Sequence, residues 1–278
     1  MKIIFLFILL VNNVFSSDAI WKIGSINSGP TQLLKDIIAI TKIKNDGDLG
    51  KLIKQTAFKW LRPKYMERWH YYCLLDRTQK RDLEKLIKHS IFAKEKMPKE
   101  KHYNAVVICC GWFSVTQRRI DFLIKLHNKG ITFDKIYLLG TVRSLRNGPE
   151  DERKLIPLLK QKKITLDEMS MIEYLWQQTA IPDSLKSIPI KSHKAVKGLD
   201  GRPTQHDALT VMVNNTKITK GEKFLIITNN PYICMHDAIA KKVLGPYEIN
   251  VETVGPAMEA ESIEDVLDSI ARCLYNLS

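Results

Sequence analysis

The chain has 278 residues, of which 45% are hydrophobic and 26% are charged. These proportions match ordinary soluble folds and exclude an intrinsically disordered chain. A formal net charge of +13 favours anionic partners. Lysine is abundant along the whole sequence, however, as a general compositional bias would produce, and we do not expect nucleic acid as a partner.

The beginning of the chain has the pattern of a secretory signal peptide. Lys2 precedes an apolar run at 3–11, and Val14 and Ser16 suit the positions three and one before a cleavage site. The run is shorter than the roughly 20 residues that a membrane-spanning helix needs. We therefore predict a signal peptide over 1–16, export to the periplasm or out of the cell, and no transmembrane segment after cleavage.

The five cysteines form no C-x-x-C pair and have no zinc-like spacing, so we assign no metal ligand among them. An oxidising compartment would permit one disulfide, with Cys73 or Cys273 as a candidate partner, but we expect no disulfide framework. Cys109 and Cys110 end an apolar run, and one of them is expected to pack as a small hydrophobic residue.

Residues 17–100 are predicted to form a helical N-terminal region. Apolar residues recur at helical spacing over 31–44, 49–61 and 80–92. A group of aromatic residues lies between the second and third of these helices, and a role in packing is favoured over one in stacking on bases. The group consists of Trp60, Tyr65, Trp69, Tyr71 and Tyr72. A charged segment at 94–101 that contains Pro98 reads as a linker.

Residues 101–278 alternate short apolar runs with amphipathic stretches, which predicts an α/β domain. The predicted strands are 105–110, 135–139, 224–228 and 249–254. The predicted helices are 118–128, 165–179, one that opens at Thr204, 234–244 and 262–274. Continuous apolar strands indicate a parallel sheet covered on both faces, so we expect a Rossmann-like sheet sandwiched by helices.

In such a sheet, ligands bind beyond the carboxyl ends of the strands, where helix amino termini present N–H groups. Several segments after predicted strands carry glycines, arginines and amides that suit phosphate or carboxylate. The candidate ligand-binding residues are Gly111, Arg118, Arg119, Gly140, Thr141, Arg143, Arg202, Thr204, Thr228, Asn229, Asn230 and Tyr232. Asp207 and Glu173 are the candidate catalytic acid or base, because a carboxylate near cations can stay ionised and accept a proton.

Read in order, these segments resemble the SanA/YdcF-like family of Rossmann-like bacterial envelope proteins, over residues 106–254. The resemblance consists of Gly111 with a following arginine, Gly140, an acidic helix start at Asp167 and Glu168, Thr204 with Ala208, and Thr228 with Pro231 and Tyr232. The chain departs from the family pattern in having His206 and Asp207 where Glu and Asn are usual, and Ile233 where histidine is common. The resemblance implies an envelope protein that binds, and could hydrolyse or transfer, a phosphate-bearing small molecule or cell-wall precursor. Its cofactor is unknown.

Two other functions fit parts of the sequence. The pairs His206–Asp207 and His236–Asp237 would suit a metal-dependent phosphohydrolase, although adjacent residues on a helix point about 100° apart and each pair would supply one ligand. A secreted factor without enzymatic activity could instead bind an anionic partner through its basic surface.

Overall fold

In the computed structural model, the described residues are 30–44, 46–63, 66, 73–145, 150–196, 201–259 and 261–277. The predicted signal peptide, 1–16, lies outside them, as do Tyr65, Trp69, Tyr71 and Tyr72. Within these residues no helix has the length and apolar character needed to span a bilayer.

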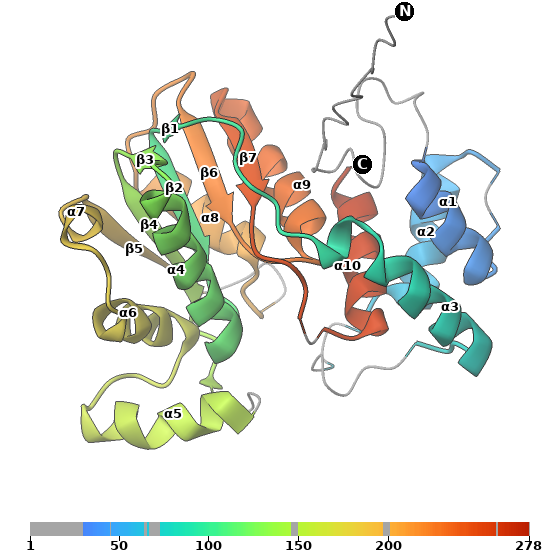
Figure 1. Ribbon diagram of the computed structural model, residues 1–278, viewed down its shortest axis with the longest axis horizontal. Coiled ribbons are helices and arrows are strands. Elements are labelled where there is room, and N and C mark those ends of the chain that lie inside the picture. Colours follow the sequence, from blue (N-terminus) through green and yellow to red (C-terminus); the bar gives the residue numbers. More distant parts are fainter. Residues whose placement is uncertain are drawn as a thin grey trace, which may run out of the picture.

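A five-stranded parallel sheet forms the centre of the fold, which confirms the α/β prediction (Figure 1). Across the sheet the order is β5-β4-β2-β6-β7, so that in chain order the strands run third, second, first, fourth, fifth. This is the Rossmann-like order, and its topological switch point lies between β2 and β6. The strands are β2 (Ala105–Cys109), β4 (Ile136–Thr141), β5 (Ile190–Ala195), β6 (Lys223–Ile227) and β7 (Asn250–Val254).

Helices cover both faces of the sheet, and strands such as β2 are therefore buried along their whole length. One face packs against α4 (Phe113–Asn128), α5 (Glu150–Gln161), α6 (Glu168–Gln178) and α7 (Asp183–Lys186). The other packs against α8 (Gln205–Asn214) and α9 (Ile233–Leu244). A small parallel pair, β1 (His102–Tyr103) with β3 (Thr132–Phe133), and two 3₁₀ turns, η3 (Ile91–Ala93) and η5 (Gly245–Tyr247), complete this part.

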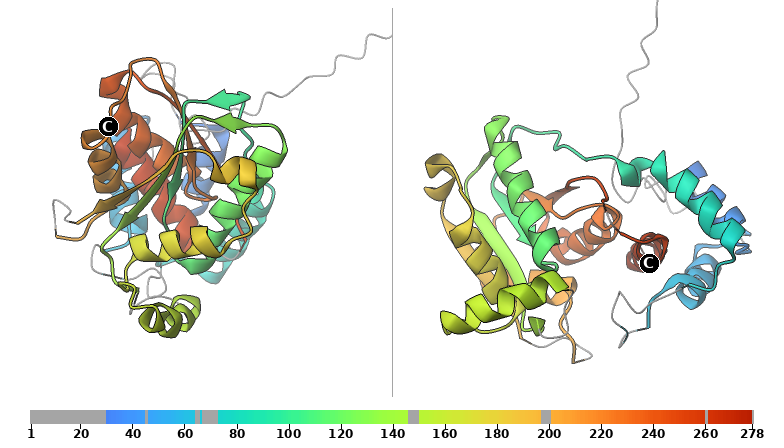
Figure 2. Two further views of the ribbon diagram at one scale, coloured as in Figure 1. Left: turned by 90° about the vertical axis from the view of Figure 1, so that its left-hand side faces the viewer. Right: turned by 60° about the horizontal axis from the view of Figure 1, so that its bottom comes forward.

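The N-terminal helices share a hydrophobic core with the end of the chain. This core joins α1 (Gln32–Ile40), α2 (Leu49–Trp60) and α3 (Arg77–Lys88) to α9 and to the closing helix α10 (Ile263–Asn276). Trp60, the one described member of the aromatic group, is buried in it, as the packing interpretation expects. Figure 2 shows α10 between α9 and the N-terminal helices.

A disulfide joins Cys234 on α9 to Cys273 on α10, with 5.8 Å between their Cα atoms. Cys73, Cys109 and Cys110 are not disulfide-bonded. Cys109 is fully buried in the core, as expected for one of the adjacent cysteines. The disulfide therefore fixes the start of α9, which follows the switch-point strand β6, to the helix that carries the N-terminal region.

Among the described helices and strands of five or more residues, two were not predicted from the sequence. Strand β5 lies at the edge of the sheet and is exposed over its first three residues, so it has no continuous apolar run. Helix α5 contains Pro157, a residue that usually ends helices. Helix α4 also starts five residues earlier than predicted, at Phe113. The prediction began at the charged residues 118 and 119 and left out the preceding turn, which contains Phe113 and Val115.

Candidate functional site

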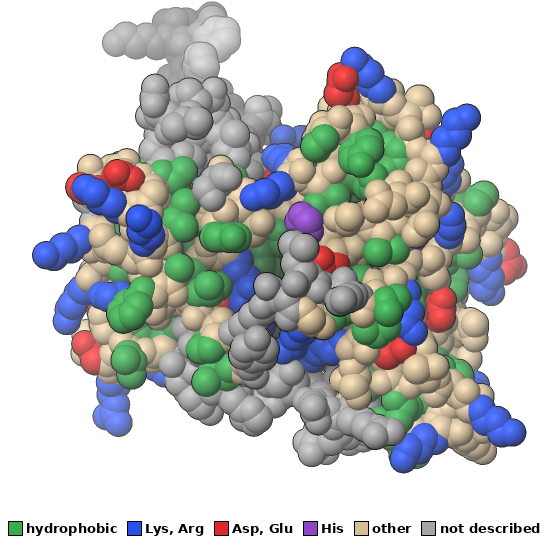
Figure 3. All heavy atoms as spheres, turned by 180° about the vertical axis from the view of Figure 1, so that it is seen from behind, with side chains coloured by type: hydrophobic (Ala, Val, Ile, Leu, Met, Phe, Trp, Pro, Cys, Tyr) green, Lys and Arg blue, Asp and Glu red, His purple; other side chains and the backbone are tan. Residues whose placement is uncertain are grey.

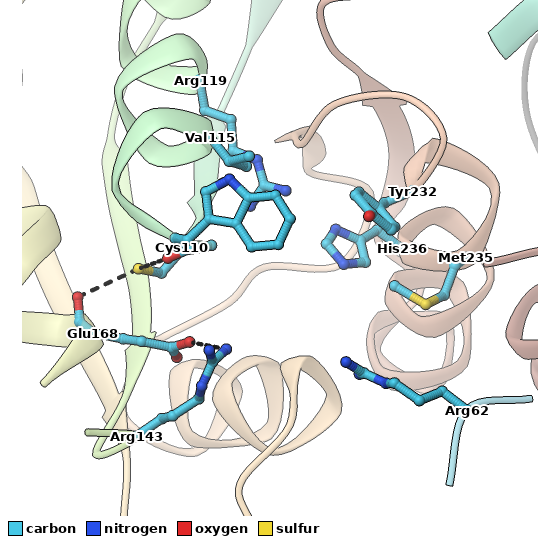
Figure 4. Close-up of a pocket in the computed structure, with 11 residues that line it drawn as sticks. Arg62, Cys110, Val115, Arg119, Arg143, Glu168, Tyr232, Met235 and His236 are labelled. Carbon is cyan, nitrogen blue, oxygen red and sulfur yellow. Dashed lines mark hydrogen bonds and ion pairs between the residues drawn. The ribbon is translucent and has the colours of Figure 1, made fainter. Parts of the chain in front are cut away.

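A pocket lies at the switch point, where the chain leaves β2 and β6 (Figure 4). Its walls come from the loop after β2, the starts of α4, α6 and α9, the loop after β4, and the segment after α2. The lining residues are Arg62, Cys110, Gly111, Trp112, Val115, Arg119, Arg143, Glu168, Tyr232, Met235 and His236. The position agrees with the general rule that open α/β sheets bind ligands at this crevice.

Two helices begin at the pocket without a side-chain cap. The N-cap residue of α4 is Trp112 and that of α9 is Tyr232, and neither accepts a capping hydrogen bond through its side chain. By contrast α1, α2, α3, α6, α8 and α10 all have Thr, Asp or Ser caps. Neither α4 nor α9 has an acidic residue in its first turn. Both helix starts therefore line the pocket without a side-chain acceptor of their own, and the positive end of a helix dipole favours an anion.

Arg119 connects the two strands of the switch point and is 2% exposed. Its Nη1 donates to the Cys109 carbonyl at 2.6 Å, and its Nε and Nη2 donate to Asn229 Oδ1 at 3.1 and 2.5 Å. Asn229 in turn donates to Glu261 Oε1 at 2.9 Å. A buried guanidinium held mainly by neutral oxygens keeps a positive charge at the pocket wall.

Glu168, the first residue of α6, also lines the pocket. Its Oε1 accepts a hydrogen bond from Arg143 Nη1 at 3.0 Å and its Oε2 accepts one from the Thr141 hydroxyl at 2.6 Å. Burial raises the pKa of the Glu168 carboxyl above its ordinary value, and Arg143, Thr141, Arg202 and Arg119 partly offset this effect. A buried carboxyl with a raised pKa beside arginines in a pocket is a candidate for proton transfer.

Gly140 lets α6 approach the sheet closely enough to place Glu168. A Cβ atom at this position would lie 2.8 Å from the Met169 Cα and 3.0 Å from its backbone nitrogen. The helix start is further fixed by Asp167, which caps Ser170 N at 2.9 Å and pairs with Lys194 Nζ at 2.7 Å. The glycine thus acts through helix packing rather than through contact with a ligand.

The α9 wall supplies Tyr232, Met235 and His236, which Figure 4 shows facing Arg119, Val115 and Cys110 across the pocket. The rings of Tyr232 and His236 are stacked at a tilt, with 6.4 Å between their centroids. Arg62, which follows α2, extends along the same side as Met235. The N-terminal region therefore contributes a charged side chain to the pocket.

The structure brings together only some of the predicted ligand-binding residues. Four of them line the pocket: Gly111, Arg119, Arg143 and Tyr232. Thr141 and Asn229 lie behind the wall and hold Glu168 and Arg119. Arg202 is close enough to Glu168 to lower the pKa of its carboxyl.

The others have contacts elsewhere. Arg118 pairs with Glu259 at 2.6 Å, and Asn230 donates to the carbonyls of Ile91 and Lys94 at 3.0 and 2.7 Å. Thr228 is fully buried. Thr204 and Asp207 form the capping box of α8, in which Asp207 Oδ2 accepts from the Thr204 N–H at 2.7 Å. Glu173 lies on α6, five residues after Glu168, and does not line the pocket.

Sequence reasoning left seven lining residues out of the predicted site: Arg62, Cys110, Trp112, Val115, Glu168, Met235 and His236. Glu168 directly follows the N-cap residue of α6, and His236 lies in the first turn of α9, the helix after β6, so position at a helix start could have marked both. Arg62 has no such signal, because it lies far from any strand in the sequence.

The described residues contain no group of three or more His, Cys, Asp or Glu side chains that could hold a metal ion. In the pair His236–Asp237, the histidine lines the pocket while the aspartate pairs with Lys241 at 2.9 Å. In the other pair, Asp207 serves the α8 capping box.

On the face of the molecule seen from behind (Figure 3), the basic residues outside the pocket are dispersed. Seen from behind (Figure 3), lysine and arginine side chains are scattered over both sides of the molecule among acidic and apolar ones. The net charge of +13 is thus not concentrated in one broad patch on this face.

The fold and the pocket define a Rossmann-like α/β protein with a basic pocket at the switch point of its sheet. The chain matches no family model, no curated protein and no solved structure.

Proposed function

We propose that this chain is an exported, envelope-associated protein that binds a phosphate-bearing small molecule or cell-wall precursor in the switch-point pocket. The observation that carries the proposal is the charge of the lining. Three arginines, Arg62, Arg119 and Arg143, face a space in which Glu168 is the one acidic side chain among the described lining residues.

Guanidinium groups and helix N-termini are the two commonest protein donors to phosphate oxygens. Here both occur in one pocket, since α4 and α9 start at it without acidic first turns. The side-chain caps of α1, α2, α3, α6, α8 and α10 would compete with an anion for the same kind of N–H groups, whereas Trp112 and Tyr232 supply no such cap.

Hydrolysis or transfer at this site would need a proton donor or acceptor. Glu168 suits that role better than Asp207 or Glu173, because it lines the pocket and its pKa is raised by burial. His236 faces the same space and is a second candidate.

Export is supported by the Cys234–Cys273 disulfide, since such bonds persist mainly in oxidising compartments. The resemblance to SanA/YdcF-like envelope proteins also favours it, although a shared fold does not by itself assign a function. N-terminal sequencing of the protein recovered from its native compartment tests this part. A mature chain that starts at Ser17 is expected, and an intact Met1 in the cytoplasm would contradict it.

Ligand binding is tested by thermal shift and calorimetry with inorganic phosphate, sugar phosphates and nucleotides. A ligand at 100 times its dissociation constant should raise the stability by about 2.7 kcal/mol. Arg143→Ala should abolish this shift, while Arg81→Ala, a change at an exposed arginine of α3, should preserve it. If no phosphate compound stabilises the wild-type protein, the binding proposal is rejected.

A further inference from the structure

Arg62 differs from the other two lining arginines, Arg119 and Arg143, in the part of the chain from which it comes. It follows α2, in a part of the chain that packs on α10 rather than on the sheet. Trp60, two residues earlier, is buried in that core and anchors the end of the helix. The side chain of Arg62 nevertheless lines the same pocket as residues from the sheet loops.

The backbone of Arg62 is fixed by a buried carboxylate on α10. Its N–H donates to Asp268 Oδ1 at 2.9 Å, and Asp268 Oδ2 accepts from Arg272 Nε at 3.0 Å. Asp268 is only 2% exposed. The carboxylate therefore fixes the main chain at Arg62, whose side chain lines the pocket.

The positive groups of the pocket fall into two sets on opposite walls. Arg119 and Arg143 belong to the wall built from α4 and the loop after β4, near Glu168. Arg62 belongs to the wall built from α9, near Met235 (Figure 4). Each wall also contains one uncapped helix start, that of α4 on the first and that of α9 on the second.

A single phosphate group would use one of these sets. We infer that the ligand carries two anionic groups, as a diphosphate does, and that Arg62 is the residue that selects for the second one. The first group would lie at α4 with Arg119 and Arg143, and the second at α9 with Arg62. This inference rests on the proposed function and extends it to the class of ligand.

The experiment compares inorganic phosphate with inorganic pyrophosphate by calorimetry in buffer without divalent cations, using the full-length protein. The wild-type protein should bind pyrophosphate at least about tenfold more tightly than phosphate. In Arg62→Gln the affinity for pyrophosphate should fall about tenfold, while that for phosphate should change less than about twofold. Arg62→Lys keeps the positive charge but lacks the planar, bidentate guanidinium, and should give an intermediate loss of affinity for pyrophosphate.

Lys54→Gln is the matched control, since it removes one positive charge from an exposed position on α2. It should leave both affinities unchanged, and a thermal melt of each variant shows that the fold is intact. If phosphate binds but Arg62→Gln weakens both anions equally or neither, the two-group inference is wrong and the proposed function stands. If neither anion binds the wild-type protein, both proposals fail.

Discussion

Arg119 and Asn229, 110 residues apart in the sequence, form a two-pronged hydrogen bond across the switch point of the sheet. Nε and Nη2 of the arginine both donate to Oδ1 of the asparagine, at 3.1 and 2.5 Å. The arginine lies on α4 after β2, and the asparagine follows β6. Because β2 and β6 are the neighbouring strands between which the strand order reverses, this contact ties the two sides of the switch point together.

Replacing Arg119 should destabilise the protein markedly. Arg119→Met removes three hydrogen bonds and leaves the Cys109 carbonyl and Asn229 Oδ1 buried without that donor. Hydrogen bonds to charged groups contribute about 1.5–3 kcal/mol each, so we expect the free energy of unfolding to fall by about 3 kcal/mol or more. Urea denaturation measures it. Arg81→Met at an exposed site should cost less than about 0.5 kcal/mol; equal losses in the two variants would refute the structural role of Arg119.

Gly140 should tolerate no side chain. In Gly140→Ala the new Cβ would meet the backbone of Met169 at 2.8 Å, which forces α6 away from β4 and displaces Glu168. Overpacking of this kind costs about 1–3 kcal/mol, and phosphate affinity should fall with it. Gly245→Ala is the control, because nothing lies within 4 Å of a Cβ there. Melting temperatures of both variants decide the point, and a wild-type melting temperature for Gly140→Ala would contradict the packing argument.

Anion binding should weaken as the pH rises through the raised pKa of Glu168. Deprotonation puts a negative charge beside Arg143, Arg119 and Arg202, where it competes with the ligand. Sulfate is the suitable probe, because it does not titrate between pH 5 and 8. Glu168→Gln should bind sulfate at least about threefold more tightly at pH 8 and with a flatter pH profile.

His236 faces the same pocket and imidazole titrates in this range, so the profile is measured also in His236→Gln. A profile that disappears in His236→Gln and persists in Glu168→Gln would assign the effect to the histidine.

The raised pKa of Glu168 also determines how the stability of the protein changes with pH. Between the ordinary value of 4.5 and the raised pKa, the folded state holds more protons than the unfolded state. The contribution of Glu168 to stability therefore falls as the pH rises through that window.

The Cys234–Cys273 disulfide should contribute substantially to stability, since it closes a loop with a sequence separation of 39. The chain-entropy relation gives about 4 kcal/mol for such a loop. The double variant Cys234→Ala/Cys273→Ala should unfold at lower urea, and a reductant should bring the wild-type protein to the same midpoint without moving that of the variant. Alkylation of the denatured, unreduced protein should label three cysteines, and labelling of all five would show that the bond is absent.

Much of the architecture could be predicted because apolar runs report burial directly. The strands β2, β4 and β6 are apolar along most of their length, β7 contains Val251 and Val254, and the spacing of the four already indicated parallel crossovers. The edge strand β5 escaped prediction because its four central residues, 191–194, are polar, as the edge of a sheet permits. The proposed signal peptide at 1–16 and the boundary near residue 100 stay predictions.

The candidate site could be predicted only in part. Residues directly after strands, such as Gly111 and Arg143, were found because strand ends converge in any parallel sheet. Asp207 drew attention as a carboxylate near cations, yet its side chain is engaged in capping α8. A sequence pattern gives the position of a carboxylate along the chain, but not the direction in which its oxygens point.

By itself, then, the sequence determined the fold class, since hydrophobic periodicity depends on local composition, and it predicted the edge of the sheet at which a ligand would bind. Tertiary structure alone decided that Arg62 and Glu168 line a single pocket. The contact between Arg62 and Asp268 spans 206 residues of sequence. Such a contact arises from the packing of α2 on α10, and no local pattern in either segment encodes it.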